Sequence, residues 1–179
     1  LNWVKNERNR PIFKLDRLAP ANHIEHTNAH DAMADVRATI GIARIIKDTQ
    51  PKFFNYALSL NDKKEVAQLV KPLHPMLLTS SSFGYKSSFT RLVTSICNHP
   101  EYNDRSIVFN LNQDPEIFLE LESEELKTLT FSKKSDLPKG IEKLDLSELV
   151  YNKSPMFVCS PNSDNFKLSP ILIEKFELN

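Results

Sequence analysis

Three histidines and two aspartates gather in a short stretch near the start of the chain, at His23, His26, His30, Asp31 and Asp35. The histidines follow the spacing H-x2-H-x3-H. Zinc binds imidazole nitrogens, and three histidines with one water form an open catalytic zinc site. Two observations disfavour a zinc site here. The first two histidines precede the helix predicted below, and no cysteine joins the group.

Two other interpretations of the same stretch remain. Polar residues favour helix starts because they cap free N–H groups and suit the helix dipole. His30 and Asp35 also resemble a nuclease pair, in which Asp35 binds a divalent metal and His30 accepts a proton from the attacking water. Two metals about 4 Å apart would stabilise an in-line phosphodiester displacement. Five residues of an ideal helix rotate by about 140°, so the two side chains converge only if His30 lies at a frayed helix start. Geometry alone leaves capping and nuclease chemistry both open.

The element that must position Asp35 is a helix predicted over residues 28–48. Asn28 is the expected cap, with Asp31 in the first turn, and Pro51 enforces a stop. Apolar residues recur in steps of three and four and form one stripe: Met33, Val36, Ile40, Ala43 and Ile46. We expect this stripe to be exposed, to pack against the β region, or to pair with another copy, because exposed apolar patches find partners.

The rest of the chain divides into a helical part and a β-rich part. Residues 1–27 read as irregular, because Pro11 and Pro20 break helices, with one helical turn over 15–18. A second helix is predicted over 52–70, with a break near Asn61 and Asp62. After Pro72, short apolar runs alternate with turn residues, which predicts a small antiparallel barrel or sandwich. The expected strands are 76–79, 90–97, 106–111 and 155–159, interrupted by an acidic helix over 116–129 that Ser123 helps to cap.

Aromatic and cationic residues mix in the segment from residue 83 to residue 91: Phe83, Tyr85, Lys86, Phe89 and Arg91. Single-stranded nucleic acid is bound by aromatic stacking platforms and scattered cations. The same spacing is also typical of a strand with one buried face, because Phe83, Tyr85 and Phe89 are separated by even numbers of residues. In that case the two cations are solvated surface charges.

Composition limits the function classes. The chain has 179 residues, with 40% hydrophobic and 26% charged residues, which is typical of a globular protein. Its formal net charge is zero, so overall charge gives no support for phosphate binding. Two cysteines in no metal-like spacing suit a reducing compartment. No apolar run approaches the ~20 residues needed to span a bilayer, and no signal-peptide pattern is present, so we expect a cytoplasmic protein. Because the chain opens on Leu1 without an initiator methionine, we expect it to be part of a longer protein.

The extended sequence around Asp35 resembles the bacterial exonuclease I family of DEDDh exonucleases. In the last motif of that superfamily a histidine precedes an aspartate by five residues, as His30 precedes Asp35. The specific matches are Ala21-Asn22, Ile24-Glu25-His26 and the run from Asn28 to Val36, together with Asn2-Trp3, Leu18 and Ala38-Thr39-Ile40. Weaker matches follow at Gln50-Pro51, Tyr56, Phe83-Gly84, His99-Pro100-Glu101, and Lys153 with Pro155. The resemblance covers most of the chain.

The resemblance implies an α+β fold and an activity. Residues 1–50 would be the C-terminal helical portion of a ribonuclease-H-like exonuclease domain, 51–71 a connecting helix, and 72–179 an SH3-like antiparallel β domain. The activity implied is 3′→5′ hydrolysis of single-stranded DNA to nucleoside 5′-monophosphates with two Mg²⁺ ions. Asp35 would be a metal ligand and His30 the general base. The D-x-E carboxylates of the family cannot be placed in this sequence, so we expect the chain alone to be inactive; the alternative is a non-catalytic SH3-like module that binds single-stranded DNA or a peptide.

The resemblance also implies a protein partner. Exonuclease I binds the acidic C-terminal tail of single-stranded-DNA-binding protein, and such a tail needs an apolar pocket beside a cation. Tyr56 matches a family aromatic residue near that site, and Lys167 is the candidate cation, because the family's arginine-bearing stretch is replaced here by residues 161–165 without arginine.

Overall fold

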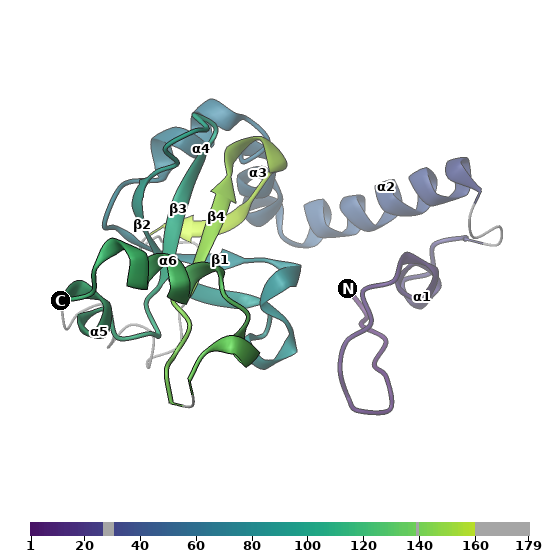
Figure 1. Ribbon diagram of the computed structural model, residues 1–179. Coiled ribbons are helices and arrows are strands. Elements are labelled where there is room, and N and C mark those ends of the chain that lie inside the picture. Colours follow the sequence, from purple (N-terminus) through teal and green to yellow (C-terminus); the bar gives the residue numbers. More distant parts are fainter. Residues whose placement is uncertain (27–30, 139, 160–179) are drawn as a thin grey trace. The chain divides into compact units, whose positions relative to one another are not determined.

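The structure, a computed structural model, describes residues 1–26, 31–138 and 140–159. The chain forms two compact units, Leu1–Leu58 and Ser59–Asn179 (Figure 1). The first unit contains α1 (Leu15–Ala21), α2 (Ala32–Thr49) and nearly all of α3 (Pro51–Ser59). Among the described residues, no helix has the length and apolar character needed to cross a bilayer.

The helix that carries Asp35 starts later than predicted. Asp31 is its N-cap, and its side chain accepts a hydrogen bond from the backbone N–H of Met33 at 3.3 Å. The predicted cap, Asn28, lies outside the described residues. The C-terminal end agrees with the prediction, because α2 stops at Thr49, two residues before Pro51.

Helix α1 is longer than the single turn predicted. The expectation that Pro20 breaks the helix is wrong, because Pro20 lies inside the last turn of α1. Packing and side-chain bonding hold this turn in place: Ala19 is fully buried, and the Asn22 side chain donates to the Leu18 carbonyl at 2.8 Å. Asn22 also bonds to Asn2, accepting from its N–H at 2.7 Å and donating to its carbonyl at 3.0 Å.

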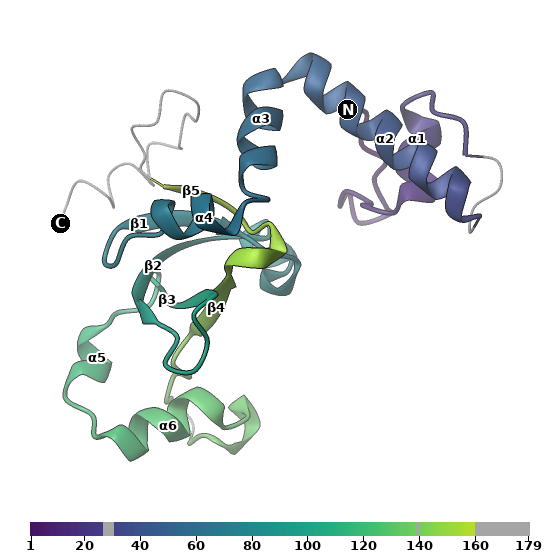
Figure 2. The same ribbon diagram turned by 90° about the horizontal axis from the view of Figure 1, so that it is seen from above.

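Small residues let α1 and the following loop approach α2 closely, and the two helices lie side by side in both views (Figures 1 and 2). Ala38 is fully buried, and a Cβ added to Gly41 would lie 3.0 Å from Ile24. On α2, Met33, Val36 and Ile40 are exposed. Exposure was one of the three outcomes expected for the apolar stripe, and these three residues show it.

The second unit is built on one antiparallel sheet in the order β4-β3-β2-β1-β5. The four predicted strands are confirmed as β1 (Pro75–Thr79), β2 (Thr90–Asn98), β3 (Arg105–Asn110) and β5 (Met156–Cys159). Strand β4 (Leu146–Val150) was not predicted. Its short mixed sequence, Leu-Ser-Glu-Leu-Val, carries a weak signal, and pairing with β3 fixes it as a strand.

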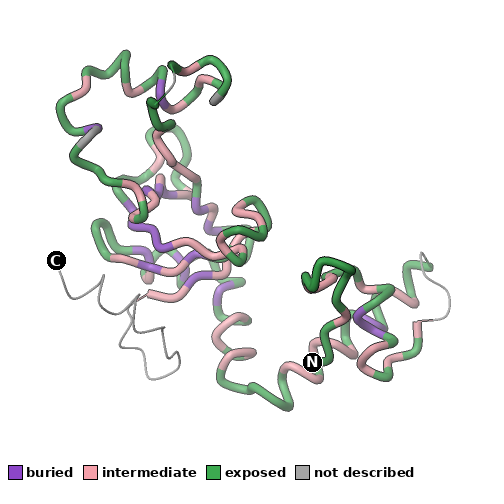
Figure 3. Tube along the Cα trace, turned by 90° about the horizontal axis from the view of Figure 1, so that it is seen from below, coloured by how far each residue is buried: buried purple, intermediate pink, exposed green. Residues whose placement is uncertain are grey.

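The core of this unit lies mainly along the strands, where the buried positions gather in Figure 3. Phe157, Met76, Val93, Val108 and Leu149 are almost completely buried, one from each strand. At the centre of the sheet, β2 buries four consecutive residues from Leu92 to Ser95 instead of alternating. The predicted α+β class with an antiparallel β unit is therefore confirmed.

The second unit also contains helices. The predicted break in 52–70 is confirmed, because α3 ends at Ser59 and α4 (Lys63–Leu69) begins after Asp62, whose side chain accepts from the N–H of Lys64 at 2.8 Å. The single acidic helix predicted over 116–129 is wrong. The chain forms α5 (Glu116–Leu119) and α6 (Ser123–Phe131).

Glu122, not Ser123, caps α6. The side chain of Glu122 accepts from the backbone of Glu125, and the Glu125 side chain accepts from the N–H of Glu122 at 3.0 Å, which is a capping box. Phe118 and Leu129 from these two helices pack with Phe109 of β3 in a small core cluster.

Candidate nucleic-acid interface and the Asp35 carboxylate

Asp35 lies in the first turn of α2 and is held by a buried histidine. The Nε2 atom of His26 lies 2.7 Å from Oδ1 of Asp35. The His26 side chain is 2% exposed, whereas the Asp35 side chain is 45% exposed. The carboxylate is therefore anchored through one oxygen and accessible to solvent.

A zinc site formed by three histidines finds no support in the described part of the chain. His23 is exposed and has a left-handed backbone with φ of 60°. The Nε2 of His26 is engaged by Asp35. His30, the third histidine and the proposed general base, lies outside the described residues. Within them, no group of three or more His, Cys, Asp or Glu side chains could hold a metal ion.

The same observation limits Asp35 as a metal ligand. A divalent metal such as Mg²⁺ needs several oxygen ligands in a near-octahedral arrangement. Asp35 supplies one carboxylate, and one of its oxygens already accepts from His26. The described residues of this chain therefore do not form a complete metal site around Asp35.

The segment that precedes β2 is not a strand. It forms two short 3₁₀ turns, η1 (Ser81–Phe83) and η2 (Tyr85–Ser87). Gly84, Ser88 and Phe89 have φ values of 70°, 52° and 61°. Positive φ reverses the chain and destroys the alternation of a strand, so the interpretation with one buried face is wrong for residues before Thr90.

The three aromatic residues of this segment have different environments. Tyr85 is 44% exposed and packs edge-on against Phe89, with ring centroids 4.6 Å apart. Phe83 is half-buried, and the guanidinium of Arg91 lies over its ring, 4.5 Å from the centroid. Lys86 is exposed between them in sequence. Tyr85 and Lys86 are thus accessible, while Phe83 is covered on one face.

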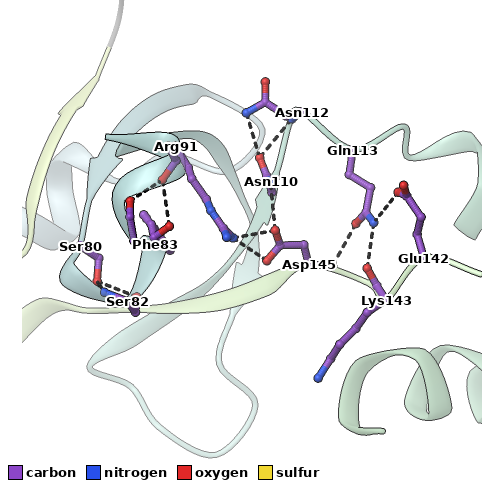
Figure 4. Close-up of polar contacts among 12 residues, drawn as sticks. Ser80, Ser82, Phe83, Arg91, Asn110, Asn112, Gln113, Glu142, Lys143 and Asp145 are labelled. Carbon is purple, nitrogen blue, oxygen red and sulfur yellow. Dashed lines mark hydrogen bonds and ion pairs between the residues drawn. The ribbon is translucent and has the colours of Figure 1, made fainter. Parts of the chain in front are cut away.

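Arg91 is not a solvated surface charge. Its Nη1 donates to both oxygens of Asp145, at 2.7 and 2.6 Å. Asp145 in turn accepts from Asn110 Nδ2 at 2.9 Å, and its own N–H donates to Oε1 of Gln113 at 2.9 Å (Figure 4). Sequence reasoning missed Asp145, because it is 54 residues from Arg91 and reaches it only through the pairing of β2, β3 and the chain entering β4.

A second charged cluster lies at the opposite ends of β3 and β4 and was also missed. Arg105 bonds to Asp104 at 3.0 Å and to Glu148 at 2.8 Å, and its guanidinium lies 4.3 Å from the centre of the Tyr102 ring. The hydrogen bond from Arg105 holds the pKa of Asp104 below its ordinary value. His99 supports the adjoining turn, because its Nδ1 accepts from the N–H of Glu101 at 3.1 Å.

Of the two candidates for a peptide tail, only one is described. Tyr56 lies in α3 and is half-buried. Lys167 lies outside the described residues.

Comparison with known proteins identifies relatives for both units. A model of the exonuclease I SH3-like domain matches residues 61–164. A protein named exodeoxyribonuclease I from Haemophilus influenzae is 36% identical over 159 residues, which are 87% of this chain and 34% of that protein. The protein of the same name from Escherichia coli is 38% identical over 139 residues, which are 76% of this chain and 29% of that protein. The chain therefore spans about a third of the length of these curated relatives.

Solved structures give the same result. This chain aligns with the crystal structure of E. coli exonuclease I in complex with a dT13 oligonucleotide, with a TM-score of 0.83 and 32% identity. The alignment covers 100% of this chain and 38% of that protein. The zinc-ion-bound form of the E. coli exonuclease I complex with single-stranded DNA covers 100% of this chain and 37% of that protein, with a TM-score of 0.81 and 32% identity.

Proposed function

Because this chain belongs to the exonuclease I family, we propose that it is part of an exonuclease that hydrolyses single-stranded DNA in the 3′→5′ direction and releases nucleoside 5′-monophosphates. The observation that carries this proposal is the Asp35 carboxylate, exposed at the start of α2 and anchored by His26 at 2.7 Å. It stands in the His-x4-Asp motif that carries the resemblance to this family. The names of the curated relatives support the reaction class.

Asp35 would contribute one carboxylate to a pair of Mg²⁺ ions, and His30 would accept the proton of the attacking water. Metal ions in such sites polarise the phosphodiester and stabilise the oxygens that carry developing charge. One solved relative was obtained in a zinc-ion-bound form, which supports metal binding by that protein. Since the described residues provide Asp35 alone, we propose that this chain is inactive without further carboxylates.

The second contribution of the chain would be a surface that binds single-stranded DNA. Tyr85 offers an exposed ring, stiffened by its contact with Phe89, and Lys86 adds an exposed cation. Stacking on aromatic rings beside cations is how proteins bind single strands without reading their sequence. The solved relatives in complex with single-stranded oligonucleotides support this assignment.

The activity is tested on a 3′-labelled single-stranded oligonucleotide with Mg²⁺, using the 179-residue chain and its Asp35→Ala variant. We expect no cleavage by either, because one carboxylate holds Mg²⁺ poorly. Cleavage by the chain that disappears in the variant would contradict the incomplete-site proposal. It would show that the remaining ligands come from this chain or from a second copy.

Binding is tested separately by fluorescence anisotropy with the same oligonucleotide. We expect the chain to bind, and we expect Tyr85→Ala to weaken binding by roughly tenfold, because a stacking aromatic contributes about 1–3 kcal/mol per base. Phe13→Ala removes an exposed aromatic ring of the other unit and is the control. Equal affinities for the two variants would exclude Tyr85 as a stacking platform.

A different function class also remains, a non-catalytic module that binds single-stranded DNA or a peptide. We propose domain boundaries at 1–50, 51–71 and 72–179; the compact units divide between Leu58 and Ser59.

Two further partners are proposals. The first is the acidic tail of single-stranded-DNA-binding protein, which would bind near Tyr56. The second is another copy of the chain, which would associate through the exposed stripe of Met33, Val36 and Ile40. Titration with the tail peptide against Tyr56→Ala tests the first, and light scattering tests the second.

A further inference from the structure

Arg91 is the cation of the candidate interface that the fold has already neutralised. Both oxygens of Asp145 lie within 2.7 Å of its Nη1. The two side chains are only 25% and 33% exposed, so solvent screens the pair less than it screens a surface ion pair. The pair as a whole carries no net charge toward a phosphate.

Neighbouring residues hold this arrangement from both sides (Figure 4). Asn110 donates to Asp145 Oδ2 at 2.9 Å, so the carboxylate cannot follow Arg91 outward without losing this bond. The backbone N–H of Asp145 donates to Gln113 at 2.9 Å and holds the chain at this position. The ring of Phe83 lies 4.5 Å from the guanidinium carbon on another side. A planar guanidinium stacked on a ring and bonded to a carboxylate loses little entropy in that geometry.

We infer that Asp145 withholds Arg91 from single-stranded DNA, so that the carboxylate sets how strongly the Phe83–Arg91 surface binds the strand. This inference rests on the proposed binding of single-stranded DNA. In the intact pair, Arg91 neutralises Asp145 instead of a phosphate. Arg91 also covers one face of Phe83, so a base cannot stack on that face. Asp145 acts through Arg91 and is a positioning residue, not a DNA contact.

The physical consequence is measurable in the salt dependence of binding. Each phosphate that a protein neutralises on a single strand adds about 0.7 to the slope of log affinity against log salt. Asp145→Asn keeps the side-chain shape but removes the charge that competes for Arg91. The released guanidinium is then free to pair with a phosphate, and we expect about fivefold tighter binding at low salt with a slope steeper by about 0.7.

The experiment measures anisotropy of a labelled oligonucleotide with four forms of the full chain: unmodified, Asp145→Asn, Arg91→Gln/Asp145→Asn, and Glu120→Gln. Glu120 is an exposed carboxylate of the same unit, so its variant reproduces the change in net charge. The double variant restores a neutral pair without a guanidinium. We expect the double variant to bind within about twofold of the unmodified chain, because neither the intact Arg91–Asp145 pair nor its uncharged replacement neutralises a phosphate. Thermal melts of all four forms establish that each is folded.

Four outcomes overturn the inference. If Asp145→Asn binds no more tightly than Glu120→Gln, Arg91 is not released to the strand. If the double variant binds several-fold more weakly than the unmodified chain, the intact pair itself contacts DNA. If no form binds the oligonucleotide, the proposed DNA surface fails together with this inference, whereas binding by all four with equal slopes refutes only the role of Asp145.

Discussion

His26 and Asp35, nine residues apart, join the chain before α2 to its first turn through a hydrogen bond of 2.7 Å between Nε2 and Oδ1. Because an ionised carboxylate oxygen only accepts, the proton of this bond is on Nε2. The other ring nitrogen of His26 is buried and has no partner among the described residues. Among the described residues, Asp35 is therefore the one hydrogen-bond partner of the His26 side chain, and His26 fixes the carboxylate on which the proposed function rests.

Replacing His26 by asparagine is expected to destabilise the start of α2. The variant loses a buried ring and leaves the Asp35 carboxylate without its donor, which together cost about 1–3 kcal/mol. Hydrogen exchange of the first turns of α2 measures the loss. His23→Asn is the matched control, because His23 is exposed and asparagine tolerates its left-handed φ of 60°. Equal protection of α2 in the two variants would show that the bond does not stabilise the helix.

A buried hydroxyl pair in the second unit gives a separate stability prediction. The hydroxyl groups of Ser106 and Tyr151 are hydrogen-bonded, and both residues are buried. Tyr151→Phe leaves Ser106 with only its longer bond to Asn98 at 3.4 Å. We expect a loss of about 1–2 kcal/mol in urea unfolding, the cost of a buried polar group that loses its partner. Tyr102→Phe removes an exposed hydroxyl and should change stability by less than about 0.5 kcal/mol.

Asp104 predicts how the second unit responds to acid. Its pKa is lowered from the ordinary value of 3.8, first by the hydrogen bond from Arg105. A carboxyl whose pKa is depressed on folding stabilises the fold above its unfolded pKa, and this stabilisation is lost as pH falls through the folded value. The stability difference between the unmodified chain and Asp104→Asn should therefore shrink below pH 3.8. Urea unfolding at a series of pH values from neutral to below 3.8 measures this stability difference.

The control for Asp104 is Asp136→Asn, which removes an exposed carboxylate that bonds to the neighbouring Ser135. We expect the free energy of unfolding of Asp136→Asn to fall at low pH in nearly the same way as that of the unmodified chain. A constant difference between the unmodified chain and Asp104→Asn at every pH would contradict the predicted linkage.

The two cysteines should differ in reactivity. Burial raises the pKa of the Cys159 thiol, an effect that the charge of Lys71 partly offsets, and its Sγ donates to the Leu69 carbonyl at 3.3 Å. Cys97 is exposed. Because the thiolate is the reactive form, iodoacetamide near pH 8 should modify Cys97 at least about tenfold faster than Cys159. Peptide mass mapping over time measures both rates, and Cys97→Ser should leave the Cys159 rate unchanged; equal rates at the two thiols would contradict the prediction.

Local sequence determined the features whose signals lie within a few residues. The apolar stripe of α2 predicted the helix, and β-branched runs such as residues 106–111 predicted strands, because the period of the apolar side chains distinguishes a helix from a strand. The extended motif around Asp35 carried the family resemblance, which the comparisons confirm. The break between α3 and α4 was also local, since Asp62 caps the next helix with its own side chain.

The tertiary structure decided what depends on residues distant in sequence or on backbone reversal. Strand β4 has a weak propensity and exists because β3 offers it hydrogen bonds. The left-handed backbone at Ser88 and Phe89 removed the strand predicted from alternating aromatics. From the sequence alone, Arg91 would be counted as a positive charge available for binding, because its partner Asp145 is 54 residues away. Only the antiparallel pairing of β2, β3 and β4 brings that carboxylate to it, so folding decides whether the charge faces a phosphate or is already neutralised.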